Sequence, residues 1–540
     1  MAGPAPPPPQ HGTTARTSAP AANGHSVSAA RARLLARVAR NLLTREAGEA
    51  WRHRATEDSG HARAQRRAVA VREAFEQLGP FYIKVGQILS TREDIVPTSI
   101  ARELENLHDR ASLLPFTHME PVLETALGRG WRRMFQSFDT HRPLGAASLA
   151  QVYAARLDNG RPVAVKVQRP HIRHVVEEDM KMLQRAARHF AARAPVFNAT
   201  IDTKAMLGVI LDAMRPELDF VLEAGNMDRA RASARSFTLL NVPDVLDATP
   251  TVLIQSLAPG MSIRDADPTA FKREERIAIG REILAYMYQG YFTDMVFHAD
   301  PHPGNIFVSP GEPATLIDWG MVGHIDRRLS MSLMLILLSL SRNDGTALAK
   351  AWIDMGRLTA WADVSAFAQD MTTLVPKITT ASLEELNFGT TLAQVLSHST
   401  RRGIQTSPMV SILGKSFANT DGSVRYLAPE LSVTGVFQDQ MRTILFDYAR
   451  DALSEAQAAR TAMELLIAAQ SAPGELRGLL RDLANQELTV QVASVAKQRF
   501  SPTEDRIDSR MRKAVRTGAA LTALALWRAD HLYRRAHPPR

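Results

Sequence analysis

The stretch HADPHPGNIFVSPGEPATLIDWG, residues 298–320, decides the fold. Its two apolar runs, IFV and ATLI, are separated by a turn-rich Ser-Pro-Gly-Glu-Pro segment, which indicates two short strands joined by a loop. Asp300 and Asn305 stand just before the first strand, and Asp318 follows the second. Carboxylate and amide oxygens are the ligands that Mg²⁺ prefers. The stretch therefore predicts a site at which Asn305 and Asp318 hold a magnesium ion.

A lysine on an upstream strand extends this interpretation. Phosphoryl transfer from ATP requires a strand lysine held by a glutamate, an acid near the acceptor and side-chain oxygens on magnesium. Lys166 ends the apolar run VAVK, and Asp300 and Asn305 have the D-x-x-x-x-N spacing of kinase catalytic loops. Each piece alone is common, but their order and spacing together favour one shared site over three unrelated structural residues. We therefore predict ATP and Mg²⁺ as cofactors, with Asp300 orienting the acceptor.

The hydrophobic pattern around these motifs predicts a bilobed α+β fold. Residues 143–168 alternate apolar and polar positions around Asn159-Gly160, which predicts two antiparallel strands joined by a tight turn. A small sheet followed by a large helical part is an α+β arrangement. The other expected elements are helices over 69–127, a helix at 172–193, one continuous helix at 204–234, a second strand pair within 240–260, and mostly helices from residue 269 onward.

The net charge of +9 is concentrated at the two ends of the 540-residue chain. Residues 1–72 carry twelve arginines against four acids, a net +8, and residues 506–540 carry nine basic residues against two acids, a net +7. Residues 73–505 therefore carry a net −6, so the basic character belongs to two tails. The tails lack interleaved aromatic residues, and we expect no specific nucleic acid as a partner. The chain has no cysteine, which excludes disulfides and thiolate metal sites.

The stretch ARARLLARVARNLLTREA, residues 30–47, predicts a basic amphipathic helix with Leu34, Leu35, Val38 and Leu42 on one stripe. Two interpretations are open: a helix packed on the folded body, or contact with an anionic membrane surface. No apolar stretch reaches the roughly 18 residues needed to span a bilayer, so no transmembrane helix is predicted. The N-terminus does not read as a secretory signal, and we expect a cytoplasmic protein, either free or peripheral at the inner face of the membrane.

Taken together, the motifs resemble those of the UbiB/AarF family, atypical protein-kinase-like ATPases associated with ubiquinone and other isoprenoid quinones. The resemblance runs from about residue 78 to residue 387, and more weakly to about residue 436. It implies a bilobed protein-kinase-like fold with a helical N-terminal extension and a helical C-terminal extension. The motifs that carry it are K-x-G-Q at 84–87, an alanine-rich nucleotide loop at 145–148, E-x-D at 217–219 and D-P-H-P-G-N at 300–305.

The resemblance also implies roles for individual residues. Lys166 pairs with Glu223 to position the phosphates, and both join Asp300 as catalytic residues. The alanine-rich loop and the backbone of a hinge hold the nucleotide, through Ala146, Ala147, Ser148, Lys166, Ser256, Leu257 and Ala258. The family-specific motifs close over the place where an ordinary kinase binds a peptide, through Lys84, Gly86, Gln87, Glu217 and Asp219. Glu217 and Glu223 lie six positions apart on one expected helix and point about 120° apart, so they take separate roles.

This family function implies ATP binding with Mg²⁺-dependent hydrolysis or phosphoryl transfer that supports isoprenoid-quinone or related lipid metabolism. An isoprenoid lipid and quinone-biosynthesis proteins are the implied partners besides the nucleotide. The alternative is a nucleotide-gated scaffold or chaperone-like component of a lipid-biosynthetic complex, because every catalytic part could serve binding alone. The expected domains are a disordered and basic segment (1–72), the K-x-G-Q extension (73–140), an N-lobe with a helical insertion (141–258), a C-lobe (259–400), a helical extension (401–505) and a basic tail (506–540).

Overall fold

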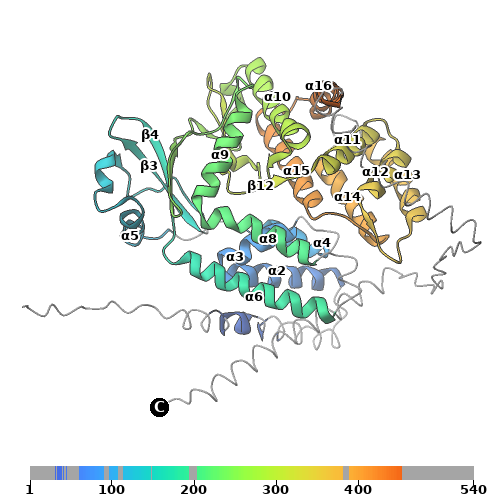
Figure 1. Cartoon of the computed structure of the whole chain (residues 1–540), viewed down its shortest axis with the longest axis horizontal. Coiled ribbons are helices and arrows are strands. Elements are labelled where there is room, and N and C mark those ends of the chain that lie inside the picture. Colours follow the sequence, from blue (N-terminus) through green and yellow to red (C-terminus); the bar gives the residue numbers. More distant parts are fainter. Residues whose placement is uncertain are drawn as a thin grey trace, which may run out of the picture.

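The structure is a computed structural model that describes residues 60–90, 96–107, 113–147, 149–193, 203–380 and 388–452, with part of residues 31–44. Two lobes lie side by side above a layer of helices (Figure 1). Within the described residues, none of the helices combines the length and the apolar character needed to cross a bilayer. The predictions for residues 1–30 and 506–540 fall outside the described part of the chain.

The N-terminal lobe is built on an antiparallel sheet of order β1-β3-β4-β7-β6, with β2 paired to β3. The predicted hairpin is confirmed, because β3 and β4 pair in register on either side of Asn159-Gly160, where Gly160 adopts a φ of +82°. The first predicted strand begins later than expected, since residues 145–146 form the separate strand β2. The strands are β1 (Phe135–Phe138), β2 (Gly145–Ala146), β3 (Ala150–Leu157), β4 (Pro162–Gln168), β6 (Val245–Ala248) and β7 (Val252–Ser256).

Helix α5 (Phe116–Leu127) covers one face of this sheet. It shares a separate core with the strands, formed by Met119, Leu123, Trp131, Tyr153, Val163, Val165 and Ile254. The assignment of residues 113–140 to the helical extension is therefore corrected. These residues complete the core of the sheet, and β1 pairs directly with β3.

Helix α9 (Phe220–Ala234) packs against β6 and β7. The continuous helix expected over 204–234 is wrong, because α8 (Thr203–Leu218) ends just before Asp219 and α9 begins just after it. Asp219 has an extended φ of −147°, and its carboxylate accepts a hydrogen bond from the backbone N–H of Val221 at 3.1 Å. Asp219 is thus an N-cap, a position that favours aspartate and interrupts helical dihedral angles. The predicted insertion helix is confirmed as α6 (Ile172–Arg193).

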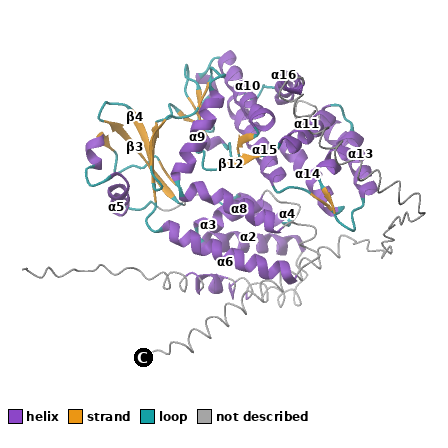
Figure 2. Cartoon of the chain, viewed as in Figure 1, coloured by secondary structure: helices purple, strands orange, loops and turns teal. Residues whose placement is uncertain are grey.

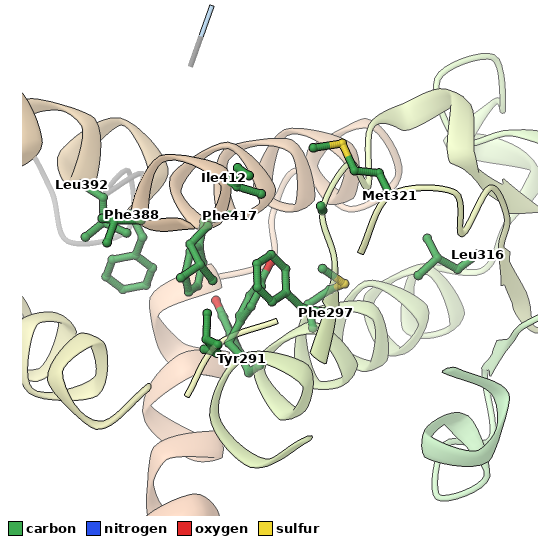
Figure 3. Packing of buried hydrophobic residues seen from close by; sticks show 14 of the residues in the cluster. Tyr291, Phe297, Leu316, Met321, Phe388, Leu392, Ile412 and Phe417 are labelled. Atoms are coloured by element: carbon green, nitrogen blue, oxygen red, sulfur yellow. The ribbon is translucent and has the colours of Figure 1, made fainter. Parts of the chain in front are cut away.

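The C-terminal lobe is mostly helical, as expected. Its core contains a cluster of aromatic rings in which Tyr291 lies 4.2 Å from Phe417 and 5.1 Å from Phe297, measured between ring centroids (Figure 3). Such offset and edge contacts stabilise a core beyond their buried area. Helices α10 (Arg273–Gln289), α11 (Arg327–Ser341), α12 (Gly345–Met355), α13 (Val364–Thr380), α14 (Phe388–Arg401), α15 (Met409–Leu427) and α16 (Val433–Ala452) form this lobe.

Short strands lie between the lobes and carry the opening stretch of sequence. The two strands predicted there are confirmed as the antiparallel pair β10 and β11, and β9 pairs with β12 beside them. These pairings bring residues 298–305 and residue 318 to the same place, since the backbone N–H of Ile317 donates to the carbonyl of Asn305 at 2.9 Å. These short strands are β5 (Leu240–Asn241), β8 (Met261–Ser262), β9 (Val296–His298), β10 (Ile306–Val308), β11 (Ala314–Leu316) and β12 (Val322–His324). A separate pair, β13 (Arg357–Leu358) and β14 (Ile404–Gln405), lies among the helices of the C-terminal lobe.

The layer below the lobes consists only of helices in the described part of the chain (Figure 2). Helices α2 (Gly60–Leu78), α3 (Pro80–Ser90) and α4 (Thr98–Glu105) pack on one another, and α3 also contacts α6 and α8. Because α8 leads directly into α9, this layer is connected to the helix that packs on the sheet. The K-x-G-Q motif lies on α3 and therefore reaches the lobes from below.

The N-terminal amphipathic segment packs on this layer. Val38 is buried in the main core, and Leu34 and Leu35 pack against it. The Arg31 guanidinium donates to the buried carboxylate of Asp179 on α6 and, at 2.7 Å, to the carbonyl of Leu78. Of the two open interpretations, packing on the folded body is the one the structure shows for these positions.

Candidate functional site

Lys166 is the centre of the site. It lies on β4, paired on one side with Val152 and on the other with Leu253, so its backbone is fixed by the middle of the sheet. Its ammonium lies 2.9 Å from both carboxylate oxygens of Glu223 and 3.2 Å from the Oδ1 of Asp318. One cation thereby joins the sheet, helix α9 and the loop after β11.

The pKa values of Lys166, Glu223 and Asp318 follow from their burial and from the charges around them. Burial alone would lower the pKa of Lys166, but the charges of Asp318, Glu223 and Glu217 outweigh it and raise the pKa above the usual value. The Lys166 charge holds the pKa of Asp318 well below its usual range, against the effect of burial. Burial raises the pKa of Glu223, although the Lys166 ammonium acts in the opposite direction. Asp318 is therefore a fixed anion next to a fixed cation.

Asp318 and Asn305 are arranged as a pair of oxygen ligands. Asp318 adopts a left-handed φ of +60° and its side chain is 44% exposed, so one carboxylate oxygen contacts Lys166 while the group remains accessible. The Nδ2 of Asn305 donates to the carbonyl of Asp300 at 3.1 Å, which leaves the amide oxygen as an acceptor. Among the described residues, no three acidic, histidine or cysteine side chains are grouped to bind a metal alone. The donor set fits a hard dication that takes its other ligands from nucleotide phosphates.

Asp300 lies deeper and is held by helix α15. Its Oδ1 accepts a hydrogen bond from Asn419 at 2.7 Å and lies 3.4 Å from the ammonium of Lys415. Two serines of the same helix bind the backbone of the loop, since Ser416 donates to the carbonyl of His298 at 2.7 Å and Ser423 to that of Pro301 at 2.9 Å. Helix α15 therefore fixes both the D-P-H-P-G-N loop and its acid.

The charges around Asp300 determine its chemistry. Burial would raise its pKa, but Lys415, His302 and Lys84 outweigh burial and the pKa lies below the usual value. A carboxylate with a lowered pKa is a weak general base. Asp300 is therefore better suited to orient an acceptor than to take a proton from it.

The lid motifs reach the site through Lys84. Its ammonium lies 3.0 Å from the Oε1 of Glu217, which joins α3 to α8. The same Glu217 oxygen lies close to Gly320, and the Glu217 charge raises the pKa of Lys166. Glu217 and Glu223 thus have separate partners, as expected, but for a different reason than predicted. They belong to two helices and not to two faces of one.

The other lid residues have structural contacts. Gln87 donates to the carbonyl of Leu107 at 3.3 Å, and it lines a small cavity together with Lys84, Asp300 and Lys415. A Cβ at Gly86 would come within 2.3 Å of a Leu107 methyl carbon and 2.9 Å of the Phe75 ring, so a larger residue would have to displace these side chains where α3 packs.

The acid that ends the E-x-D motif, Asp219, is not brought into the site. It caps α9, and its nearest cation is Arg173 at 3.9 Å. We therefore place Asp219 among the residues that shape the junction of α8 and α9.

The residues expected to hold the nucleotide are only partly accessible to a ligand. Ala146 lies on β2, and the Ala147 carbonyl accepts a hydrogen bond from Arg169 at 3.1 Å. The backbone N–H of Ala147 donates to the carbonyl of Ala150 at 2.9 Å, so this loop is folded back on itself. Ser148 lies outside the described residues.

In the expected hinge, two of the three backbone donors are already engaged. The N–H of Ser256 donates to the carbonyl of Asp244 at 2.9 Å, and the N–H of Leu257 donates to the carbonyl of Pro162 at 3.3 Å. The N–H of Ala258 has no hydrogen-bond partner among the described residues. Of the three residues predicted to form the hinge, Ala258 is therefore the one whose backbone N–H is left available to bind adenine.

Sequence reasoning missed Lys415 and Asn419. A signal was present, because Lys415, Asn419 and Ser423 recur every four positions and so follow one face of the helix. What the sequence could not show is that this face meets residues 298–305, more than a hundred positions earlier in the chain.

Comparison with known proteins identifies the family of the chain. Residues 106–352 match the ABC1 atypical kinase-like domain. The chain is 32% identical over 373 residues to "Probable protein kinase UbiB" of Pseudomonas entomophila, covering 68% of this chain and 69% of that protein. It is 33% identical over 375 residues to the protein of the same name in Pseudomonas putida GB-1, with the same coverage. Among solved structures it is similar to Rv3197 of Mycobacterium tuberculosis in complex with erythromycin, at 25% identity and a TM-score of 0.45, covering 65% of this chain and 90% of that one.

The sheet, the Lys166–Glu223 pair and the two loops define a kinase-like protein with α+β architecture. The chain belongs to the UbiB family of atypical kinase-like proteins.

Proposed function

We propose that this protein binds ATP with Mg²⁺ and hydrolyses it, or transfers its γ-phosphoryl group to a small acceptor, in support of isoprenoid-quinone or related lipid metabolism. The observation that carries the ATP part is the contact of one buried ammonium with Glu223 at 2.9 Å and with the accessible Asp318 at 3.2 Å. This is the arrangement that positions phosphates and metal in kinases. Membership of the UbiB family supports the link to quinones.

In this proposal each residue of the site has a defined task. Lys166 binds the α- and β-phosphates and is held in place by Glu223. Asn305 and Asp318 hold Mg²⁺, which neutralises the charge that develops on the transferring group. The N–H of Ala258 binds the adenine, and Asp300 orients the acceptor.

The contacts of Asp300 bear on which acceptor is used. Its carboxylate is 19% exposed and already has Asn419 and Lys415 as partners, with Lys84 close by. A protein hydroxyl would have to displace these groups, whereas water needs little room. We therefore favour water or a small molecule over a peptide as the acceptor.

The same contacts are the one observation that favours the alternative, a nucleotide-gated scaffold with little turnover. A protein that only binds ATP needs Lys166 and Asp318 but has no use for an accessible Asp300.

Phosphate release by the full chain with ATP, Mg²⁺ and anionic liposomes distinguishes the two. Release that is lost in Asp318→Asn supports the enzyme. Tight ATP binding without release, with and without liposomes, supports the scaffold. Absence of ATP binding in the wild type contradicts both.

A further inference from the structure

A cavity of about 350 Å³ lies behind the nucleotide site, where α9, α10, β9 and β12 meet. Figure 1 shows α9, α10 and β12 near one another in the upper middle of the molecule. The side chains of Tyr286, Met287, Phe297 and Trp319 line it, and all four are buried. The volume falls in the range of pockets that enclose a small organic molecule, and the wall is of the apolar and aromatic kind that such pockets use.

Polar groups gather along one part of this wall. Ser233 donates to the carboxylate of Asp294, and Gln289 donates to both of them, so these groups have partners. Asn226 donates to the carbonyl of Trp319 at 3.0 Å and accepts from Arg229 at 2.6 Å.

Arg229 differs from these groups in its positive charge, which has no carboxylate partner in the described part of the chain. It is exposed, and its guanidinium makes no ion pair with a carboxylate among the described residues. Its charge is nonetheless felt locally, because burial and Arg229 together lower the pKa of His324. A guanidinium with unused donors at the edge of an apolar cavity is suited to a carboxylate, which it can bind through two hydrogen bonds.

We propose that this cavity binds a small apolar acid, with an aromatic or branched aliphatic body against Tyr286, Phe297 and Trp319 and a carboxylate on Arg229. The ligand would be distinct from the nucleotide, because the cavity does not include Lys166 or Asp318. Among the described residues that line the cavity, Arg229 is the one arginine or lysine, which argues against a second nucleotide, whose phosphates need several cationic or backbone donors.

The cavity is connected to the nucleotide site through helix α9. Asn226 lies one turn after Glu223 on this helix, and it binds the residue that follows Asp318. A ligand that contacts Asn226 and Trp319 therefore affects both partners of Lys166. By linkage, the acid and the nucleotide change each other's affinity by the same factor. The coupling between acid and nucleotide rests on the proposed function, whereas binding of the acid does not.

The binding test uses the full chain, calorimetry and three probe acids: 1-naphthoate, benzoate and 3-methylbutanoate. The neutral match for the first is 1-naphthylmethanol. We expect 1-naphthoate to bind about tenfold more tightly than the alcohol, since a hydrogen bond to a charged group contributes more than a neutral one. Arg229→Gln should remove that preference, and Arg235→Gln, at the exposed end of the same helix, should retain it.

Filling the cavity tests its location. Ala230→Leu and Val322→Phe each add a side chain to the lining from a different element, and either one should abolish binding of all probes. Thermal unfolding identifies a variant that fails to fold, in which case the other decides. The proposal is overturned if no probe binds the wild type, if Arg229→Gln binds 1-naphthoate as the wild type does, or if binding survives in a folded cavity-filled variant.

The coupling test compares the ATP affinity with and without saturating 1-naphthoate. A change of about fivefold, absent in Arg229→Gln, is expected for coupled sites. If the acid binds and ATP affinity does not change, the proposed coupling is wrong, but the proposed acid-binding cavity is supported. If the acid binds but ATP never does, the proposed function fails and the acid site is unaffected.

Discussion

The candidate site has an open side, where the nucleotide is expected around Lys166 and Asp318, and a closed side, where the acceptor is expected at Asp300. On the nucleotide side, Lys166 has two carboxylate partners and Asp318 remains 44% exposed. On the acceptor side, the 19% exposed Asp300 has partners from α15, and Lys84 from α3 lies nearby. Helix α3 belongs to the layer below the lobes, and α15 belongs to the C-terminal lobe. Under the proposed function, this difference leaves the nucleotide side accessible and restricts which acceptor can reach Asp300.

The largest effect should come from removing the charge on the open side. Asp318→Asn keeps the shape of the side chain but weakens both the metal site and the contact with Lys166. We expect ATP turnover to fall by on the order of 100-fold or more, because electrostatic stabilisation is lost where charge develops. A phosphate-release assay measures this, with the exposed Asp228→Asn on α9 as control. Unchanged turnover and unchanged Mg²⁺ dependence would remove Asp318 from the metal site.

The second effect concerns the ion pair behind the open side. Lys166→Met leaves Glu223, which is 1% exposed, without its cation. Breaking a buried pair in this way costs about 3–5 kcal/mol, whereas replacing both partners is close to neutral. We therefore expect Lys166→Met to destabilise the protein in urea and Lys166→Met/Glu223→Gln to restore much of the loss.

Measuring ATP affinity in Lys166→Met and in Lys166→Met/Glu223→Gln separates the effect on stability from the effect on nucleotide binding. Both should bind ATP at least about tenfold more weakly than the wild type, since the phosphate ligand is absent in each. Recovery of affinity in the double variant would show that Lys166 acts only on folding.

The third effect tests the closed side. Lys415→Met removes one of the charges that lower the pKa of Asp300. The pKa of Asp300 should rise, so that its carboxylate can take a proton from the acceptor in addition to orienting it, and turnover should increase by up to about tenfold with unchanged ATP affinity. Steady-state kinetics measure this, with Lys377→Met on α13 as the exposed control. A fall in turnover would mean that Lys415 holds Asp300 in its working position.

The smallest effect is on packing beneath the closed side. Gly86→Ala places a Cβ within 2.3 Å of Leu107 and 2.9 Å of Phe75. Overpacking of this kind costs about 1–3 kcal/mol. Gly208→Ala on α8, where a Cβ meets nothing within 4 Å, should instead leave stability unchanged or raise it slightly. Equal melting temperatures for the two variants would show that the lid helix does not pack as described.

The difference between the open nucleotide side and the closed acceptor side also explains which features the sequence could predict. The β3–β4 hairpin depends on local signals, namely alternation and an Asn-Gly turn, and it was predicted correctly. The residues that meet around Lys166 were named from motifs whose order in the chain is typical of kinases. These features depend on short spacings or on a known order of elements, both of which are visible in one sequence.

The closed side depends on contacts that no local pattern specifies. Asn419, which lies 119 positions after Asp300, reaches it only because α15 packs across the D-P-H-P-G-N loop. The break at Asp219 was missed because helical periodicity continues on both sides of it. An aspartate directly before an apolar helical run is a capping signal, and it could have been given more weight.

The most direct test of the difference between the two sides is to follow the γ-phosphoryl group. Wild-type protein is incubated with γ-labelled ATP, Mg²⁺ and a general protein substrate, and the label is divided between free phosphate and protein. If the nucleotide side is open and the acceptor side is closed, nearly all of the transferred label appears as free phosphate or on a small molecule. Label that accumulates mainly on protein side chains would contradict the account.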